Sequence, residues 1–357
     1  GEAARHPDSL RGHGTLRPSR HPRMTVHPPR ALVTGGAGFI GSHVVDALLA
    51  RGWSVRVFDD FSNGLRENVS PAAEICPGDI RNREAVEEAA RGCAWVFHLA
   101  ALGSVPRSMK NPGQTHDVNV AGTYNLFLAA QTTGVERIVF SSSSSIYGDD
   151  PRIPKSEDQI GRPLSPYAAS KRANEIEAQG FAPVFSGPIV GLRYFNVFGP
   201  RQRHDSPYAA VIPLFFRAAF QGESPVIYGD GLQSRDFTFV EDIAHANLLA
   251  AEADLPPGRA HIYNVGAGGS TSVLDLWREI ARLTGARQPP HHAPPRPGDV
   301  RDSRASVAKA KMELGYEPEY DLAGGLAKSL LWYRESLTKT PPETERRPPS
   351  REFSVPR

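Results

Sequence analysis

A glycine-rich turn near the N-terminus constrains the fold more than any other feature of the chain. A short apolar run, residues 30–33, leads into Gly35, Gly38 and Gly41, and an amphipathic helix is expected over 42–51. Glycines between a strand and a helix let backbone N–H groups approach a pyrophosphate, and the helix dipole favours the anion there. Because a second strand pattern follows at 54–58, the stretch predicts a dinucleotide-binding βαβ unit.

Asp59 ends the second expected strand and indicates which dinucleotide binds. A carboxylate at this place accepts hydrogen bonds from the adenosine ribose hydroxyls, and it repels the 2′-phosphate of NADP. The predicted cofactor is therefore NAD.

Strands and helices continue to alternate beyond this unit. Strands are expected at 74–76, 95–99 and 137–140, and a helix at 119–133. The alternation predicts an α/β fold, a Rossmann-type doubly wound parallel sheet with a smaller C-terminal α/β lobe. Asp79 follows one strand and could meet the adenine, while Ala100 begins a small-residue loop suited to lie against the cofactor. His98, inside an apolar strand, is expected to be a core histidine rather than a base.

A serine run and a tyrosine–lysine pair suggest the chemistry. Serines occupy positions 141–145 after the strand at 137–140, and Tyr167 and Lys171 are four residues apart on an expected helix. That spacing puts both side chains on one helix face. There we expect the ammonium to lower the pKa of the phenol, with a serine hydroxyl as a relay. The trio suits removal of a proton from an alcohol whose carbon gives up a hydride.

The βα regularity ends near residue 197. We predict an NAD-binding domain of residues 30–196 plus 236–265, and a substrate lobe of 197–235 plus 266–337. Arg235, Arg296 and Arg301 could converge on a diphosphate, because guanidinium groups match phosphate oxygens, and Asp299 could hold a ribose. Ordinary surface salt bridging is the alternative for any one of these arginines.

Five stretches of the chain resemble the extended short-chain dehydrogenase/reductase family, and within it the NAD-dependent nucleotide-sugar 4-epimerases. They are ALGSVPRS (101–108), PLSPYA (163–168), GLRYFNVFG (191–199), YAAVIP (208–213) and GDVRDS (298–303). The similarity covers about residues 30–335 and looks closest to the bacterial UDP-N-acetylglucosamine 4-epimerases, which interconvert UDP-GlcNAc and UDP-GalNAc. It implies an isomerase that works through a transient 4-keto sugar and bound NADH.

The resemblance also implies roles at matching positions. Tyr167 would be the base, Lys171 its electrostatic partner and a ligand of the nicotinamide ribose, and Ser143 the catalytic serine. The implied cofactor-binding residues are Gly35, Gly38, Phe39, Ile40, Gly41, Asp59, Asp79, Ile80, Ala100, Asn119, Tyr167, Lys171 and Tyr194. The implied substrate-binding residues are Ser104, Ser143, Ser145, Asn196, Arg235, Arg296, Asp299 and Ser303. No metal ion is expected.

Two positions separate this chain from other members of the family. The 4,6-dehydratases carry Thr-Asp-Glu where this chain has Ser143-Ser144-Ser145, and hydroxyls cannot replace a carboxylate base, so dehydration is not expected. At Ser303 a small residue leaves room for an N-acetyl group, unless it is a plain loop serine. The alternative function is a UDP-glucose/UDP-galactose 4-epimerase or a bifunctional enzyme, followed by UDP-glucuronate epimerases or decarboxylases. A non-catalytic NAD(P) sensor is disfavoured because such relatives usually lack the Tyr/Lys pair.

Composition supplies the remaining expectations. Lys and Arg number 41 against 39 Asp and Glu, so no nucleic-acid or membrane partner is indicated. No apolar run is long enough to span a bilayer, no signal peptide is recognisable, and Cys76 and Cys93 are expected to be free thiols, so the predicted location is cytoplasmic. Segments 1–29 and 338–357 are predicted to be disordered, with Met24 as the natural start.

The resemblance implies a homodimer that pairs the helices carrying Asn119 and Tyr167. Gly180 and Pro183 follow the Tyr/Lys pair, so the helix that carries it is expected to be short, with an irregular end.

Overall fold

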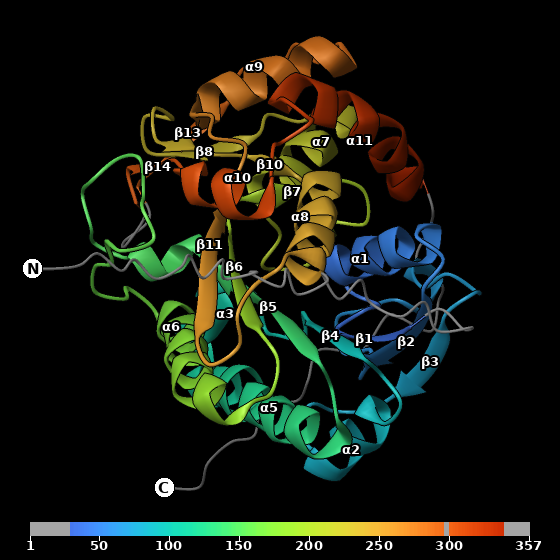
Figure 1. Ribbon diagram of the computed structural model, residues 1–357. Coiled ribbons are helices and arrows are strands. Elements are labelled where there is room, and N and C mark those ends of the chain that lie inside the picture. The colour runs from blue at the N-terminus through green and yellow to red at the C-terminus, as the bar shows by residue number, and fades with distance from the viewer. Residues whose placement is uncertain (1–28, 296–299, 339–357) are drawn as a thin grey trace, which may run out of the picture.

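A seven-stranded parallel sheet forms the centre of the protein (Figure 1). The computed structural model describes residues 29–295 and 300–338. The strands of this sheet are β1 (Arg30–Thr34), β2 (Ser54–Asp59), β3 (Glu74–Pro77), β4 (Trp95–His98), β5 (Arg137–Ser143), β6 (Ile189–Tyr194) and β11 (Ala260–Val265). Their order is β11-β6-β5-β4-β1-β2-β3, and neighbouring strands are parallel. The order reverses between β1 and β4, where such folds bind ligands, and the predicted doubly wound α/β fold is confirmed.

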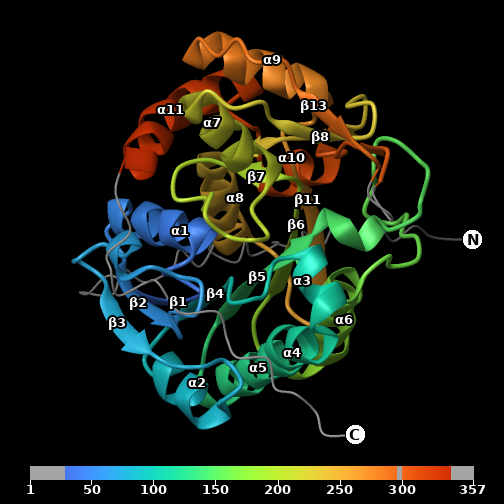
Figure 2. The same ribbon diagram turned by 180° about the vertical axis from the view of Figure 1, so that it is seen from behind.

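Helices cover both faces of the sheet (Figures 1 and 2). One face carries α1 (Phe39–Ala50) and α8 (Val240–Glu252), and the other carries α2 (Arg83–Ala90), α5 (Gly122–Thr133) and α6 (Pro166–Phe181). Shorter elements lie in the connections: η1 (Arg66–Asn68), α3 (Val105–Lys110), α4 (Pro112–His116), η2 (Asp117–Ala121), η3 (Ser144–Tyr147) and η4 (Ala182–Val184). A parallel sheet covered on both faces needs mostly apolar strands, and the central strands β1, β4, β5 and β6 are largely buried.

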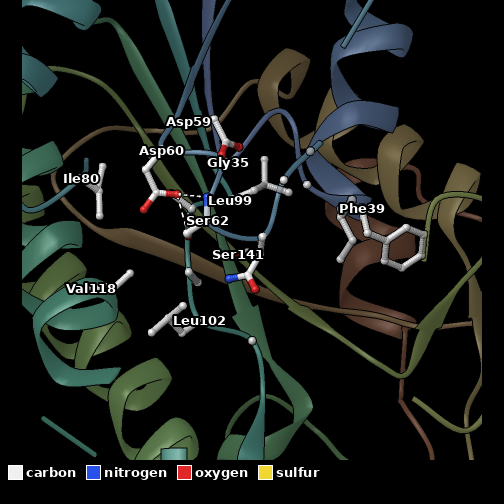
Figure 3. A pocket seen from close by; sticks show the side chains of 18 of the residues that line it. Gly35, Phe39, Asp59, Asp60, Ser62, Ile80, Leu99, Leu102, Val118 and Ser141 are labelled. Carbon is white, nitrogen blue, oxygen red and sulfur yellow. Dashed lines mark hydrogen bonds between the residues drawn. The ribbon is translucent and has the colours of Figure 1, made fainter. Parts of the chain in front are cut away.

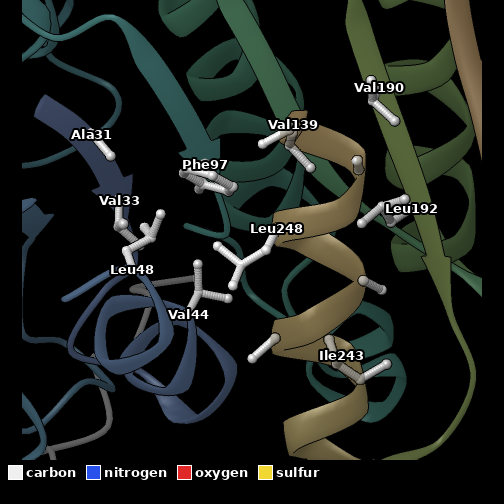
Figure 4. Close-up of a cluster of buried hydrophobic side chains, with 14 of the residues drawn as sticks. Ala31, Val33, Val44, Leu48, Phe97, Val139, Val190, Leu192, Ile243 and Leu248 are labelled. Carbon is white, nitrogen blue, oxygen red and sulfur yellow. The ribbon is translucent and has the colours of Figure 1, made fainter. Parts of the chain in front are cut away.

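Two apolar layers hold the helices to the sheet. On one side, Val44 and Leu48 of α1 and Ile243 and Leu248 of α8 pack against the strands (Figure 4). On the other side, Phe127 of α5 belongs to a second buried cluster beneath α2, α5 and α6. The two layers fix the strand ends, and with them the residues that follow each strand.

A smaller lobe packs beyond the carboxyl end of the sheet. Its elements are β7 (Val197–Phe198), α7 (Val211–Gln221), β8 (Val226–Tyr228), β9 (Ser234–Arg235), β10 (Thr238–Phe239), β12 (Thr271–Ser272), α9 (Val273–Thr284), β13 (His291–Ala293), β14 (Asp302–Ser303), α10 (Ala308–Leu314) and α11 (Leu322–Thr338). Phe215, Trp277 and Leu326 lie in its own buried cluster. Between its two segments the chain returns to the main sheet as α8 and β11, and β11 pairs with β6.

Helix α6 is longer than the sequence predicts. It runs for 16 residues to Phe181, so the expectation of a short helix is wrong. Gly180 lies in its last turn, where glycine costs only about 1 kcal/mol relative to alanine. Burial of Phe181, whose ring stacks on Phe127 at a centroid distance of 5.5 Å, outweighs that cost. Pro183 falls in η4, just beyond the end of the helix.

The helix expected to begin at Asn119 also starts earlier. Helix α4 begins at Pro112 and continues through the π-helical turn η2, which contains Asn119, into α5. The extra residue per turn changes the direction in which the side chains of this turn point. Asn119 is thereby buried between α5 and α6 rather than at a helix end.

Several expectations lie outside the described residues. They concern the terminal segments, apart from Pro29 and Thr338, and Arg296 and Asp299. None of the helices in the described ranges combines the length and apolar content that crossing a bilayer requires. Cys76 is partly buried and Cys93 is buried, and both are free thiols as predicted.

We predict that Phe127→Ala lowers the free energy of unfolding by about 3–5 kcal/mol, because it leaves a cavity between α5, α6 and the sheet. Phe127 is fully buried and contacts the rings of Phe140 and Phe181. Urea unfolding followed by circular dichroism measures the change. The control Met312→Ala, at a side chain that is 78% exposed, should shift the value by no more than about 0.5 kcal/mol. Equal effects of the two substitutions would contradict the packing described here.

Candidate active site

The glycine turn brings three strand ends to within backbone contact. Gly35 has φ +69°, its N–H donates to Phe58 O at 2.8 Å, and a Cβ there would lie 2.6 Å from Ala100 N. A Cβ on Gly41 would lie 2.1 Å from Gly35 O. These positions therefore admit only glycine. Helix α1 begins directly after Gly38, and no side chain caps it, so its first N–H groups can bind an anion.

A cavity of about 640 Å³ opens beside this turn (Figure 3). It extends from the start of α1, at Phe39, past the end of β2 toward Ile80 and Val118. The predicted cofactor residues that line it are Gly35, Gly38, Phe39, Ile40, Gly41, Asp59, Ile80, Ala100, Tyr167, Lys171 and Tyr194. The structure thus brings together segments that are more than 150 residues apart in the sequence.

Asp59 is held firmly at the end of β2. Its carboxylate accepts hydrogen bonds from Ala37 N at 3.0 Å and Phe61 N at 2.9 Å. Burial raises the pKa of Asp59, and these N–H groups oppose the rise. Each carboxylate oxygen keeps a second lone pair that can accept a ribose hydroxyl. The sequence analysis missed Asp60, which lines the cavity and binds Ser62 (Figure 3), although its position beside Asp59 was a signal.

Asp79 and Asn119 do not line this cavity. The Asp79 carboxylate binds the guanidinium of Arg81, which holds the pKa of Asp79 below its usual value. Asn119 is fully buried behind the loop that follows β4. Its Oδ1 accepts from Leu102 N at 2.8 Å, and its Nδ2 donates to Ser170 Oγ at 3.0 Å. Asn119 therefore ties the cavity wall to α6.

Tyr167 and Lys171 come from the first two turns of α6. Ser165 caps this helix by accepting a hydrogen bond from Ala168 N at 3.1 Å. The Lys171 ammonium is buried and donates to the carbonyl oxygen of Ser141 at 2.8 Å and to its hydroxyl at 3.1 Å. Ser143, at the end of β5, lies near enough to the Tyr167 phenol to act on its pKa in the lowering direction. The predicted trio is thus brought together in space.

The protonation of this trio differs from the prediction. Burial raises the pKa of Tyr167, and the contact that acts in the lowering direction comes from Ser143. The expectation that Lys171 lowers this pKa below its ordinary value is therefore wrong for the protein alone, because the ammonium binds Ser141. Burial lowers the pKa of Lys171 to about 8, against the opposing effect of Glu175. Desolvation thus moves the pKa of Lys171 toward neutral pH and the pKa of Tyr167 away from it.

His98 is the core histidine that the sequence predicts. Its Nδ1 lies 2.7 Å from Thr34 Oγ1, and its Nε2 lies 2.9 Å from Thr123 Oγ1. Burial lowers the pKa of His98 to about 3, with a smaller effect from the charge of Lys171. The ring is neutral at physiological pH and holds β4 to β1 and α5.

A second cavity, of about 240 Å³, lies in the smaller lobe. Of the predicted substrate residues, Asn196 and Arg235 line it, together with apolar side chains from β7, α7 and β8. Asn196 has φ +27° and donates to Asp236 O at 3.2 Å. Arg235 Nη1 donates to Ser234 O at 2.8 Å and to Arg301 O at 3.2 Å. Arg301 itself forms an ion pair with Asp230 at 3.0 Å, so the salt-bridge alternative holds for this arginine.

The predicted substrate serines lie around these cavities without lining either of them. Ser104 caps α3 by accepting a hydrogen bond from Arg107 N at 3.2 Å. Ser145 Oγ is buried, and no hydrogen-bond partner for it exists among residues 29–295 and 300–338. Ser303 lies on β14, in register with Arg235 on β9. Ser303 is therefore fixed beside a residue of the second cavity.

Arg107 and Arg201 also line the first cavity, and the sequence analysis gave them no role. Arg107 donates to Asn63 at 3.0 Å, and its guanidinium lies 5.1 Å from the centre of the Tyr208 ring. Arg201 binds Asp46 on α1 at 2.7 Å. Both arginines connect segments that only the fold brings together, so no local pattern could have found them.

The fold and the glycine turn define a dinucleotide-binding protein, and comparisons with known proteins agree. Residues 31–266 match the NAD dependent epimerase/dehydratase family. The chain is 39% identical over 312 residues to a UDP-glucose 4-epimerase of Mycolicibacterium smegmatis, covering 85% of this chain and 98% of that protein. It therefore belongs to the NAD dependent epimerase/dehydratase family, and its cofactor is NAD.

Comparison with solved structures also identifies UDP-sugar 4-epimerases as similar proteins. The UDP-glucose 4-epimerase of Thermotoga maritima, determined with UDP-glucose, matches with a TM-score of 0.83 at 37% identity, over 86% of this chain and 99% of that one. A UDP-N-acetylglucosamine 4-epimerase of Methanobrevibacter ruminantium, in complex with UDP-N-acetylmuramic acid, matches with a TM-score of 0.82 at 38% identity, over 87% and 99%. The similarity covers both the main sheet and the smaller lobe.

We predict that Gly41→Ala weakens NAD binding at least about tenfold, the effect of roughly 1.4 kcal/mol. The added methyl group would displace Gly35 O and distort the turn. Calorimetric titration of the NAD-free protein and the NAD content after purification provide the measurement. Gly113→Ala is the control, because a Cβ there meets nothing within 4 Å. Unchanged affinity in Gly41→Ala would show that the turn does not need a glycine at this position.

Proposed function

We propose that the protein is a UDP-sugar 4-epimerase. The observation that carries the proposal is the row of Tyr167 and Lys171 on α6, facing the serine end of β5, at the edge of the NAD cavity. The relatives reported above are named as 4-epimerases of UDP-sugars. Tyr194 lines the first cavity and Asn196 the second, so β6 ends between a place for NAD and a place for a second ligand.

In this proposal Tyr167 removes the proton from the sugar O4 and later returns it. Ser143 lies beside the phenol and serves as a hydrogen-bonding relay between Tyr167 and the sugar hydroxyl. Lys171 supplies a positive charge that stabilises the tyrosinate once it turns from Ser141 toward the reacting groups. NAD, when bound, would supply the hydride chemistry at the sugar C4. The glycine turn and Asp59 hold the cofactor in place.

The second cavity is proposed to take the UDP half of the substrate. Ile212, Ile227 and Phe237 offer apolar surface for the uracil ring, and Gln233 offers an amide for its edge. Arg235 is placed to bind a phosphate oxygen. Arg296 and Asp299 are proposed to complete the diphosphate and ribose contacts from the segment outside the described residues. The domain division made from the sequence would then separate cofactor binding from substrate binding.

We further propose that the preferred substrates are UDP-GlcNAc and UDP-GalNAc. Ser303 supports this, because its small side chain lies in register with Arg235 and leaves space for an N-acetyl group. The similarity to the enzyme of Methanobrevibacter ruminantium is consistent with it. The names of other relatives favour UDP-glucose and UDP-galactose, which is the second candidate.

A homodimer is proposed through α5 and α6. Large apolar side chains are exposed on both helices, with Tyr124 44% exposed on α5 and Ile176 54% exposed on α6. The regular course of α6 to Phe181 removes the irregularity that counted against this pairing. Sedimentation equilibrium would test it, and a monomer at micromolar concentration would exclude it.

The substrate preference can be tested directly. Incubation with UDP-GlcNAc or UDP-glucose, with products resolved by proton NMR, should yield UDP-GalNAc faster than UDP-galactose. Ser303→Tyr should reduce turnover of UDP-GlcNAc at least about tenfold more than that of UDP-glucose, since a steric clash at C2 affects only the N-acetyl sugar. Ser303→Ala, which stays small, should leave the preference unchanged. Turnover of UDP-glucose alone by the wild-type protein would refute the Ser303 argument and keep the epimerase.

The proposed role of Tyr167 as the base can be tested by removing its hydroxyl oxygen. We predict that Tyr167→Phe lowers kcat by about 10²–10⁴-fold, the usual contribution of a general base. NAD content should stay at the wild-type level, because the glycine turn and Asp59 are untouched. Tyr124→Phe, at an exposed tyrosine on α5, is the control. Wild-type kcat in Tyr167→Phe would remove this residue from the chemistry.

A further inference from the structure

The helix face that carries Tyr167 and Lys171 continues with a buried carboxylate. Glu175 lies one turn beyond Lys171 on α6 and is 0% exposed. Residues four apart on a helix are neighbours, so the three side chains form one row. A buried carboxylate is costly unless it is paired and hydrogen-bonded. The contacts of Glu175 therefore show what it holds together.

Arginine and serine side chains satisfy both oxygens of Glu175. Arg193 on β6 binds it twice, with Nε 2.8 Å from Oε1 and Nη2 2.9 Å from Oε2. Ser142 Oγ donates to Oε1 at 2.6 Å, and Arg172 Nη1 donates to Oε2 at 3.1 Å. Arg193 is only 2% exposed, and its Nη1 donates to the Tyr147 hydroxyl at 2.9 Å. Helix α6 is thus fastened to the ends of β5 and β6.

Ser142 faces Glu175 because successive side chains of a strand point to opposite faces of the sheet. Ile138 and Phe140 lie on the face of β5 that packs with Ala178 of α6, and the next residue of that row is Ser142. Its two neighbours are the serines that contact Lys171 and Tyr167. The Ser142–Glu175 hydrogen bond therefore lies between the two contacts that bring the reacting groups together.

We propose that Ser142 and Glu175 are positioning residues for the reaction, with Arg193 holding the carboxylate. Their hydrogen bond fixes the distance between the serine end of β5 and the Tyr167–Lys171 face of α6. This inference rests on the proposed function, in which that face carries the proton chemistry. None of the three residues needs to touch the sugar to act in this way.

Fold stability alone gives no sufficient reason for this arrangement. Desolvation offsets most of the attraction within a buried ion pair, and well-packed apolar residues often replace such a pair without loss. The carboxylate has a second effect here, because it raises the pKa of Lys171 against the lowering effect of burial. The groups whose charge couples to the Lys171 ammonium are Glu175 on α6 and His98 on β4, and Arg172 and Arg193 are linked to it through their ion pairs with Glu175. His98 is neutral, so Glu175 offsets the arginine charges.

The test compares Ser142→Ala and Glu175→Gln in the NAD-loaded protein with UDP-GlcNAc and UDP-glucose. Ser142→Ala removes one hydrogen bond and no charge, so kcat should fall by about 10- to 100-fold, as for a small misplacement of reacting groups. Ser142 lines the first cavity, but its hydroxyl donates to Glu175, so KM and NAD content should stay within about twofold of wild type. Ser329→Ala is the matched control, since Ser329 is equally buried and donates to Gly325 O in α11 of the smaller lobe.

Glu175→Gln leaves the arginine charges without their partner, so Lys171 should lose its proton more readily. The alkaline limb of the kcat–pH profile should move to lower pH in this variant and stay in place in Ser142→Ala.

The outcomes separate the two proposals. If Tyr167→Phe abolishes turnover and Ser142→Ala resembles Ser329→Ala, the positioning proposal fails and the proposed function stands. A loss of kcat in Glu175→Gln that only follows a fall in melting temperature, with an unshifted kcat–pH profile, also overturns it. If Tyr167→Phe turns over at the wild-type rate, the reaction does not use this face and both proposals fail.

Discussion

The approach of Gly35 to the backbone of Ala100 is the constraint on which the rest of the structure depends. This contact, together with the packing of Gly41 on Gly35, draws the ends of β1, β2 and β4 to one point. Any side chain would separate them, because a Cβ at Gly35 or Gly41 would overlap backbone atoms. The first cavity, the N-terminus of α1 that no side chain caps and the position of Asp59 all follow from this close packing of backbone.

Burial then determines which groups can change protonation. The same desolvation that makes His98 neutral raises the pKa of Tyr167 and lowers that of Lys171 to about 8. These side chains are buried within the fold, and burial disfavours their charged forms. Arg193 and Arg172 hold the Glu175 carboxylate in the core beside them.

Both lobes contribute to the candidate site. Arg201 and Arg107 line the cavity of the main sheet while contacting α1 and the loop before α7. Ser303 lies beside Arg235, a residue of the second cavity, because β14 pairs with β9. The return of β11 to the sheet places the smaller lobe over the carboxyl end of the strands. The geometry of both cavities therefore depends on the way the two lobes pack.

The sequence by itself determined the βα alternation, the glycine turn, the Asp59 position, the core role of His98 and the Tyr167–Lys171 row. Each of these features depends on the spacing of apolar or polar residues along one element, or on backbone geometry that only certain residues allow. Tertiary structure alone decided that Asn119 lies behind the cavity, that Arg301 pairs with Asp230 and that Glu175 meets Arg193. It also carried α6 past Gly180, because the burial of Phe181 outweighs a glycine's helix propensity. Partners distant in sequence and the free energy of burial leave no local pattern, so they emerge only from the assembled fold.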